Sequence, residues 1–401
     1  MAAAQTAPTL SGTTDFLAGL RHEALNAPES GIVEVMNYGR GRAGLIPLWA
    51  GEGDIPTPSF ITEAATRSLA AGETFYTWQR GIPELREALA RYHTNLFGQP
   101  FSAERFFVTQ SGMHAVQIAA RMLAGTGDEV IILTPAWPNF AAAIGIAGAA
   151  PVMVPLVYTS EGFELDHARL EAAVTPKTRA IMVNTPANPT GWTASREDLV
   201  WLLDLARRKG LWIVADEIYT RFVYEGARAP SFRDIRTPED RILFVDTFSK
   251  NWAMTGWRLG WIEAPPEMGQ VIENLVQYSG SGVATFIQRG GVAALEKGES
   301  FVAHMVSRAA RGREILCGAL ESTGRVEFAP VRGAFYLFFK VHGKPDVRRL
   351  GLEIVDEANV GMAPGTAFGS GGEGFMRACF LSSPEVMKEA ASRLVDWLKR
   401  I

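Results

Sequence analysis

The middle of the chain, from about residue 106 to residue 263, alternates short runs of β-branched and aromatic residues with helical segments. Strands are predicted at 106–109, 130–133, 180–183, 211–214 and 242–245. Helices are predicted at 115–123 and 198–208, and Ser195-x-x-Asp198 before the second is a variant of the capping box. Strands that are apolar along their whole length are buried on both faces. The alternation therefore predicts an α/β fold with a mostly parallel sheet sandwiched by helices.

The last quarter of the sequence predicts a second, smaller unit. After about residue 290 long helical stretches dominate, with one strand-like run at 333–339. We therefore expect a large domain at 46–290 that binds the ligand and a smaller α/β domain at 291–401. Residues 1–45 are expected to form an N-terminal arm and helix that join the small domain.

The N-terminal part carries few signals of regular structure. Residues 1–27 read as a polar, mobile arm. Ser30 is expected to cap a helix in which Ile32, Val35 and Met36 share one apolar face.

Composition excludes several classes of protein. Of the 401 residues, 47% are hydrophobic and 20% are charged, as in ordinary soluble proteins. The formal charge of −4 gives no general attraction to nucleic acid. Cys317 and Cys379 are the only cysteines, so neither a disulfide framework nor a metal site is indicated. The longest apolar stretch, 140–157, contains Pro151 and is not expected to span a membrane. Residues 1–10 do not resemble a secretory signal, and a cytoplasmic location is expected.

A lysine follows the last predicted strand, in the run Thr247-Phe248-Ser249-Lys250, and Arg258 follows eight residues later. An aldehyde cofactor needs an amine that holds it covalently, and the same amine can move a proton. Positive charge from Arg258 is expected to favour the unprotonated amine. The competing interpretation is an ordinary surface lysine. The combination with the arginine favours the cofactor role.

Three polar residues follow neighbouring strands of the predicted sheet. Asp216 ends the strand at 211–214, and a carboxylate against a pyridine nitrogen keeps that nitrogen protonated, so that the ring accepts electrons. Tyr219 and Asn184 are expected to hydrogen-bond the ring oxygen, and Asn184 to reach the substrate as well. The alternatives are an aspartate that caps a turn and a tyrosine buried in the core.

The run Ser111-Gly112-Met113 opens the helix predicted at 115–123, where backbone amides can bind an anion. Arg258 adds a two-pronged cation, and Thr247 and Ser249 add hydroxyl groups. Taken alone, the run is an ordinary turn between a strand and a helix. Together with the preceding residues it predicts pyridoxal 5'-phosphate as the cofactor.

Two further residues complete the predicted site. Trp137, in Pro135-Ala136-Trp137-Pro138, is suited to stack on the cofactor ring and to border the substrate, although a core position is the alternative. Arg377 is expected to hold a substrate α-carboxylate through two hydrogen bonds, with a surface salt bridge as the alternative.

These residues together resemble the class I/II aminotransferases, the aspartate-aminotransferase-like branch of the fold-type I pyridoxal-phosphate enzymes, over roughly residues 30 to 400. The motifs that carry the resemblance are Tyr76-(x)4-Gly81-Ile82-Pro83-Glu84-Leu85-Arg86, Asn188-Pro189-Thr190-Gly191, Thr247-Phe248-Ser249-Lys250, Gly333-Ala334-Phe335-Tyr336 and Pro364-Gly365-(x)3-Gly369.

The resemblance implies a role for several positions. Lys250 corresponds to the Schiff-base lysine, Asp216 to the partner of the ring nitrogen and Arg377 to the anchor of the α-carboxylate. Gly51 is implied to lie beside the substrate carboxylate. Tyr76 is implied to reach the phosphate bound by a neighbouring subunit, which means a homodimer with shared active sites.

Departures from the family pattern bear on the substrate. Gly51-Glu52-Gly53-Asp54 stands where much of the family has Gly-Glu-Pro-Asp. Met113 stands where some aspartate-selective relatives place a lysine, and its apolar side chain favours neutral, hydrophobic or aromatic substrates. An arginine from the partner subunit that binds a second carboxylate is the alternative.

The sequence thus predicts an aminotransferase that moves an amino group between an L-α-amino acid and a 2-oxo acid by ping-pong exchange through Lys250. A carbon–sulfur β-lyase with the same cofactor remains an alternative, because it requires the same residues. A regulatory protein that binds the cofactor would need a basic DNA-binding module. Fewer than about thirty residues precede the enzyme-like region, too few for such a module.

Overall fold

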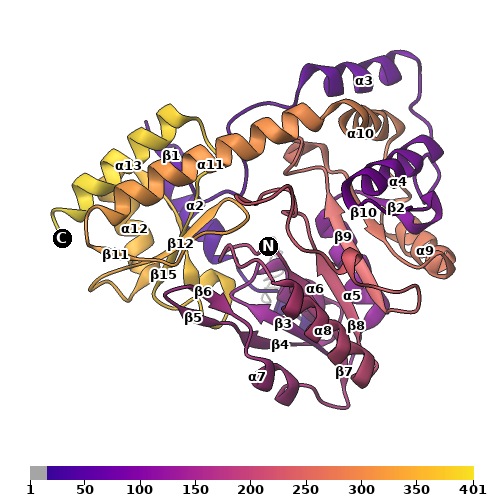
Figure 1. Ribbon diagram of the computed structural model, residues 1–401, viewed down its shortest axis with the longest axis horizontal. Coiled ribbons are helices and arrows are strands. Elements are labelled where there is room, and N and C mark those ends of the chain that lie inside the picture. The colour runs from indigo at the N-terminus through magenta and orange to yellow at the C-terminus, as the bar shows by residue number, and fades with distance from the viewer. Residues whose placement is uncertain (1–15) are drawn as a thin grey trace, which may run out of the picture.

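The computed structural model describes residues 16–401, and its largest feature is a seven-stranded sheet in the order β2-β10-β9-β8-β7-β3-β4 (Figure 1). The strands are β2 (Phe106–Thr109), β3 (Glu129–Thr134), β4 (Ala150–Pro155), β7 (Thr178–Asn184), β8 (Trp212–Asp216), β9 (Ile242–Thr247) and β10 (Gly260–Glu263). Only β10 runs antiparallel to its neighbours. The predicted α/β fold with a mostly parallel sheet is confirmed.

Helices cover both faces of this sheet because each strand sends alternate apolar side chains to opposite sides. In β7, Ala180 and Met182 pack with α5, whereas Ile181 and Val183 pack with α8. The flanking helices are α5 (Gly112–Leu123), α6 (Asn139–Ile146), α7 (His167–Ala172), α8 (Arg196–Lys209) and α9 (Gly269–Gly280). Three more helices pack beside the β2 edge, namely α3 (Ser59–Ala70), α4 (Pro83–Phe97) and α10 (Thr285–Lys297).

A second sheet, in the order β11-β12-β15-β14, lies in the C-terminal part. Its strands are β11 (Val326–Glu327), β12 (Tyr336–Val341), β14 (Ala363–Pro364) and β15 (Phe375–Cys379). Its helices are α11 (Glu299–Glu321), α12 (Val347–Ala358) and α13 (Pro384–Leu398). In Figure 1 the long helix α11 runs from the neighbourhood of α10 to this second sheet.

The N-terminal segment lies with the C-terminal sheet rather than with the large one. The strand β1 (Ile46–Pro47) pairs in parallel with β13 (Val360–Gly361), and α2 (Gly31–Gly39) contacts α12 (Figure 1). Chain segments more than three hundred residues apart therefore meet, and this meeting brings α2 to the site described below.

The two helix caps predicted from the sequence have different outcomes. Ser195 and Asp198 form the predicted capping box of α8. A helix follows Ser30 as expected, but the Ser30 side chain makes no capping hydrogen bond, so that part of the prediction is wrong. Residues 1–15 of the predicted arm lie outside the described residues, and the rest of the arm contains α1 (His22–Leu25).

The remaining elements are short connections. They are β5 (Val157–Thr159), β6 (Gly162–Glu164) and the 3₁₀ turns η1 (Ala103–Arg105), η2 (Phe232–Asp234), η3 (Thr255–Trp257), η4 (Pro266–Met268) and η5 (Gly365–Phe368). Within residues 16–401, no helix combines the length and the apolar composition needed to cross a membrane.

Candidate active site

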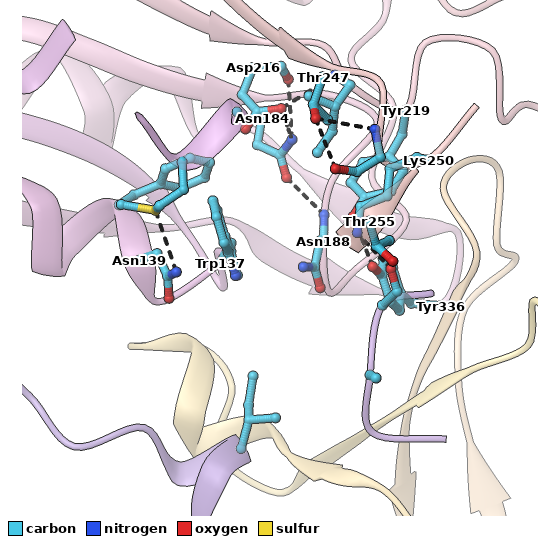
Figure 2. Close-up of a pocket in the computed structure, with 18 of the residues that line it drawn as sticks. Trp137, Asn139, Asn184, Asn188, Asp216, Tyr219, Thr247, Lys250, Thr255 and Tyr336 are labelled. Atoms are coloured by element: carbon cyan, nitrogen blue, oxygen red, sulfur yellow. Dashed lines mark hydrogen bonds between the residues drawn. The ribbon is translucent and has the colours of Figure 1, made fainter. Parts of the chain in front are cut away.

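A cavity of about 380 Å³ lies beyond the carboxyl ends of β7, β8 and β9 (Figure 2). Three parts of the chain line it: α2 with the segment after β1, the edge of the large sheet, and residues Tyr336 and Arg377 of the small sheet. Ligands of parallel sheets bind at this edge, and the volume suits a small organic molecule. Of the predicted residues, all except Ser111 and Tyr76 line the cavity.

Asp216 lies on the floor of the cavity and is 2% exposed. The amide groups of Asn184 and Ile218 donate to its Oδ1 at 3.1 Å and 3.3 Å. Among residues 16–401 no cationic side chain forms an ion pair with it, and burial raises its pKa to about 7. A buried carboxylate without an ion-pair partner fits a cationic ligand group such as a protonated ring nitrogen.

The side chain of Asn184 is hydrogen-bonded within the chain. Its Nδ2 donates to both Oδ1 and the carbonyl oxygen of Asp216, and its Oδ1 accepts from the backbone N of Asn188 at 2.8 Å. Asn184 therefore holds Asp216 and the following loop in place. Asn188 also lines the cavity, and it accepts a hydrogen bond from Arg377. The sequence interpretation missed this second asparagine, although it stands in a motif that the family resemblance included.

Lys250 extends into the cavity, where its Nζ donates to the carbonyl oxygen of Gly51 at 2.6 Å. Burial lowers the pKa of Lys250 to about 8. Arg377 and Arg258 also lower it, but by less. The predicted direction is right, whereas the predicted cause, positive charge from Arg258, is secondary to burial. Compared with an ordinary lysine, an amine with this pKa has a much larger unprotonated fraction near neutral pH, and that fraction can act as a nucleophile and a proton carrier.

One end of the cavity is rich in donors for an anion. Arg258 has a left-handed backbone conformation (φ 56°), and its Nη1 donates to the carbonyl oxygen of Thr255 at 2.6 Å. The hydroxyl oxygens of Thr247 and Ser249 are 2.9 Å apart. Gly112 begins α5, and a Cβ atom there would lie 3.2 Å from Cβ of Thr247, so this close approach favours glycine. A helix N-terminus beside an arginine and two hydroxyls fits a phosphate group.

The side chain of Ser111 caps α5. Its Oγ accepts from the backbone N of His114 at 3.0 Å as the N-cap of α5, so this hydroxyl is engaged within the helix. Its neighbours Gly112 and Met113 line the cavity instead.

Arg377 lies at the opposite end and is 2% exposed, which excludes the alternative of a surface salt bridge. Nη1 donates to Oδ1 of Asn188 at 3.0 Å, and Nη2 donates to the carbonyl oxygen of Trp49. Its Nε has no hydrogen-bond partner in the described chain. A buried guanidinium with neutral partners and an unsatisfied N–H fits an anionic group of a ligand.

The rest of the cavity wall is mostly apolar. Trp137 lies on it, in an edge-to-face contact with Phe140 at 5.5 Å between ring centroids (Figure 2). Sδ of Met113 accepts from Nδ2 of Asn139 at 3.4 Å. Ile32 and Met36 of α2 close the wall. The sequence predicted that these two residues share a helix face, but it gave no signal that this face meets the cavity.

Two predicted tyrosines occupy different environments. Tyr219 is buried, and its hydroxyl lies 2.8 Å from that of Tyr336, which the sequence interpretation had not placed in the site. Tyr76 is 94% exposed and lies outside the cavity of its own chain. Gly51 lines the cavity, and a Cβ atom there would overlap the hydroxyl of Tyr336.

Comparisons with known proteins agree with this site. The model of the aminotransferase class I and II family matches residues 44–394. Aspartate aminotransferase of Pyrococcus horikoshii is 35% identical over 87% of this chain and 90% of its own. Aromatic-amino-acid aminotransferase 2 of Thermococcus litoralis is 34% identical over 94% and 97%. The structure of the Thermotoga maritima aspartate aminotransferase superimposes with a TM-score of 0.89, at 32% identity, over 95% of this chain and 100% of that one.

The chain therefore belongs to the class I and II aminotransferases, a family of pyridoxal-phosphate enzymes of fold type I. It is an amino-acid aminotransferase, as the sequence predicted. The alternatives of a β-lyase and of a regulatory protein are not favoured by these relatives.

Proposed function

We propose that this enzyme binds pyridoxal 5'-phosphate in the cavity and exchanges amino groups between a neutral L-α-amino acid and a 2-oxo acid through Lys250. One observation carries the proposal. A buried amine with its pKa lowered to about 8 shares a small cavity with a carboxylate and a guanidinium that lack ion-pair partners within the described chain.

The cavity residues fit the parts of this cofactor. Arg258, the first amides of α5 and the two hydroxyls of Thr247 and Ser249 would hold the phosphate. Asp216 would face the ring nitrogen and Trp137 the ring. When bound, the cofactor supplies an aldehyde carbon that accepts the amino group and a ring that withdraws electrons from the substrate.

The ring oxygen would be met by Tyr219 and by Asn188. Asn184 is held by Asp216, whereas Asn188 lies beside Arg377 on the cavity wall. We therefore favour Asn188 over Asn184 for the contact with this oxygen.

The protein's own groups then divide the work. Arg377 binds the α-carboxylate and so fixes which bond of the α-carbon faces Lys250. Nζ of Lys250 takes the proton from the α-carbon and carries it onward. A general base at this position contributes about 10² to 10⁴-fold to the rate. The apolar wall around the cavity excludes water during this transfer.

The lining supports a neutral, hydrophobic or aromatic side chain on the substrate. Within residues 16–401, the cations that line the cavity are Lys250, Arg258 and Arg377. Each is already assigned, to the amino-group exchange, to the phosphate and to the α-carboxylate respectively, so none is left for an acidic side chain. Ile32, Met36 and Met113 form the remaining wall. Two of the relatives compared above are named for aspartate and one for aromatic amino acids. An arginine supplied by a second subunit is the route by which an acidic substrate would still be accepted.

A homodimer with shared active sites is the assembly that we propose. Tyr76 is 94% exposed, and the neighbouring Phe75 and the more distant Tyr278 are 84% and 87% exposed. Exposed aromatic groups of this size favour a protein contact. A second copy would bring Tyr76 to the phosphate end of the partner cavity.

The remaining proposals concern the organisation and location of the chain. A division into residues 1–45, 46–290 and 291–401 places the seven-stranded sheet in the large domain and the four-stranded sheet in the small one, while β1, at the start of the large domain, pairs with β13 of the small one. Cys317 and Cys379 are free thiols, which suits the proposed cytoplasmic location.

Oxo-acid formation measured across the common amino acids, with 2-oxoglutarate and pyruvate as acceptors, tests the function. We expect aliphatic or aromatic donors to have kcat/KM values above that of aspartate. In the Met113→Lys variant, the value for aspartate should rise about tenfold, because a second cation then faces the substrate side chain. Pyruvate and ammonia released without any acceptor would instead identify a β-lyase.

A further inference from the structure

Tyr336, at the start of β12, is fully buried and contributes to the cavity wall (Figure 2). Its hydroxyl oxygen lies 2.8 Å from the hydroxyl oxygen of Tyr219. Burial raises the pKa of both phenols, so both keep their protons at neutral pH. Each hydroxyl has one proton to donate and can accept two hydrogen bonds.

The ring of Tyr336 has a second contact. The guanidinium carbon of Arg377 lies 4.7 Å from the centre of that ring, on its face. Phe368 holds the same guanidinium at 4.9 Å. The two aromatic rings thus fix the direction in which Arg377 points.

The surroundings of the Tyr336 hydroxyl also involve the catalytic lysine. A Cβ atom on Gly51 would overlap this hydroxyl, so the glycine provides the space for it. The carbonyl oxygen of the same glycine accepts from Nζ of Lys250 at 2.6 Å. The side chain of Tyr336 is therefore adjacent to three groups. They are Tyr219, which is proposed to contact the cofactor, Arg377, which is proposed to bind the substrate carboxylate, and Gly51, whose carbonyl oxygen contacts Lys250.

We propose that Tyr336 is a positioning residue that directs Tyr219 toward the cofactor and Arg377 toward the substrate. Its hydroxyl donates to Tyr219, and the proton of Tyr219 is thereby left for the cofactor oxygen. The reverse orientation would present only lone pairs of Tyr219 to that oxygen, which is itself an acceptor. The inference rests on the proposed function, since it needs the cofactor in this cavity.

Removal of the hydroxyl and removal of the ring should have different effects. Tyr336→Phe keeps the ring and loses the hydrogen bond. The pKa of the pH-dependent visible absorbance of the holoenzyme should then rise by about half a unit to one unit, because Tyr219 becomes a weaker donor to the ring oxygen. The KM for the amino donor should change less than about twofold. Tyr336→Leu loses the ring as well, and the KM should rise about tenfold because Arg377 is no longer held.

A double substitution separates coupling from a general disturbance. In the Tyr219→Phe background, adding Tyr336→Phe should leave the absorbance pKa unchanged, because the hydroxyl acts through Tyr219. Tyr224→Phe is the matched control. It removes another tyrosine hydroxyl that is hydrogen-bonded, to the carbonyl oxygen of Ala334 at 2.6 Å, outside the cavity. This control should leave both the absorbance pKa and the KM unchanged.

The results separate a failure of the role proposed for Tyr336 from a failure of the proposed function. An unchanged absorbance pKa in Tyr336→Phe, or an equal shift with and without Tyr219, would overturn the role of the hydroxyl. Equal KM values for the Phe and Leu variants would overturn the role of the ring. A wild-type protein without any visible absorbance after reconstitution would overturn the proposed function itself.

Discussion

Asp216 and Glu217 are neighbours in the sequence, yet their carboxylates lie on opposite sides of the large sheet and in contrasting environments. Glu217 accepts from the hydroxyl of Ser231 at 2.5 Å, from the backbone N of Phe232 at 3.0 Å and from Nη1 of Arg233 at 2.9 Å. Asp216 receives hydrogen bonds only from amides in the described chain. On the side that Glu217 faces, the protein pairs its own buried charges. On the side that Asp216 faces, which borders the cavity, the charges are left for a ligand.

The paired cluster behind the sheet consists of Glu217, Arg233, Glu263 and Arg236. Nε of Arg233 donates to Glu263 at 2.7 Å, and Arg236 also pairs with Glu263. Although burial opposes it, the two arginines lower the pKa of Glu263 to about 2. Burial still raises the pKa of Glu217, since its one arginine partner, Arg233, also pairs with Glu263. The cluster has a structural role, because its ionic groups already have partners.

The largest expected effect on activity follows replacement of Lys250 in the cavity. Lys250→Ala should lower kcat by about 10⁴-fold or more, since the nucleophile and the proton carrier are both lost. Single-turnover and steady-state assays measure this. Lys297→Ala, which removes an exposed lysine of α10, is the control and should keep full activity. Wild-type turnover in the Lys250 variant would refute the assignment.

The two adjacent carboxylates provide the direct test of the comparison. Asp216→Asn should reduce kcat by about 10²-fold or more without a loss of stability, because no ion pair is broken. Glu217→Gln should keep its activity per folded molecule but lose about 3 kcal/mol of stability, because the buried charge of Arg233 then loses one of its two carboxylate partners. Denaturant unfolding and steady-state kinetics on both variants check this. The opposite assignment of effects would show that the difference between the two sides of the sheet is not functional.

Asp246, which lies on β9, sharpens the comparison because it is a buried carboxylate without an ion pair in residues 16–401. Burial raises its pKa to about 8, with Asp216 and Glu217 adding to the shift and Arg233 opposing it. The folded-state pKa therefore lies above the unfolded value of about 3.9. Between about pH 4 and about pH 8 the unfolded chain ionises at this position while the folded carboxyl keeps its proton, so the stability that is fully present at low pH is lost over this range and changes no further above it.

Asp246→Asn removes this ionisation and keeps an acceptor for the backbone N of Thr247. Relative to wild type, the variant should gain about 4 kcal/mol of stability between pH 5 and pH 9, nearly all of it below pH 8. Unfolding by denaturant at both pH values measures the gain. Asp204→Asn, at an exposed position of α8, is the control. A stability difference that does not depend on pH would contradict the expected ionisation.

The sequence predicted the floor of the site better than its walls. Asn184, Asp216 and Thr247 end successive parallel strands, so the strand pattern alone brings them to one edge. Ile32 and Tyr336 reach the cavity through α2 and the small sheet, and no local pattern indicates which distant segments meet.

The local failures have physical reasons too. Asn184 ends β7 and Asn188 lies in the loop that follows, and only the three-dimensional path of this segment decides which of them is held by Asp216 and which lies beside Arg377. The edge strand β4 was missed because it contains Pro151 and Pro155, residues that normally interrupt strands but are tolerated at an edge. The Ser111 side chain caps α5, and the anion-binding role of the amides at this N-terminus stays a prediction, because a cap and an anion site use the same residues.

The central claim is that one buried amine holds the cofactor within reach of two unpaired charges. Borohydride reduction of the wild-type protein reconstituted with pyridoxal 5'-phosphate, followed by peptide mapping by mass spectrometry, tests it most directly. The account predicts that the reduced cofactor is attached to the peptide that contains Lys250 and to no other. Attachment at a different lysine, or no attachment in a folded protein, would contradict it.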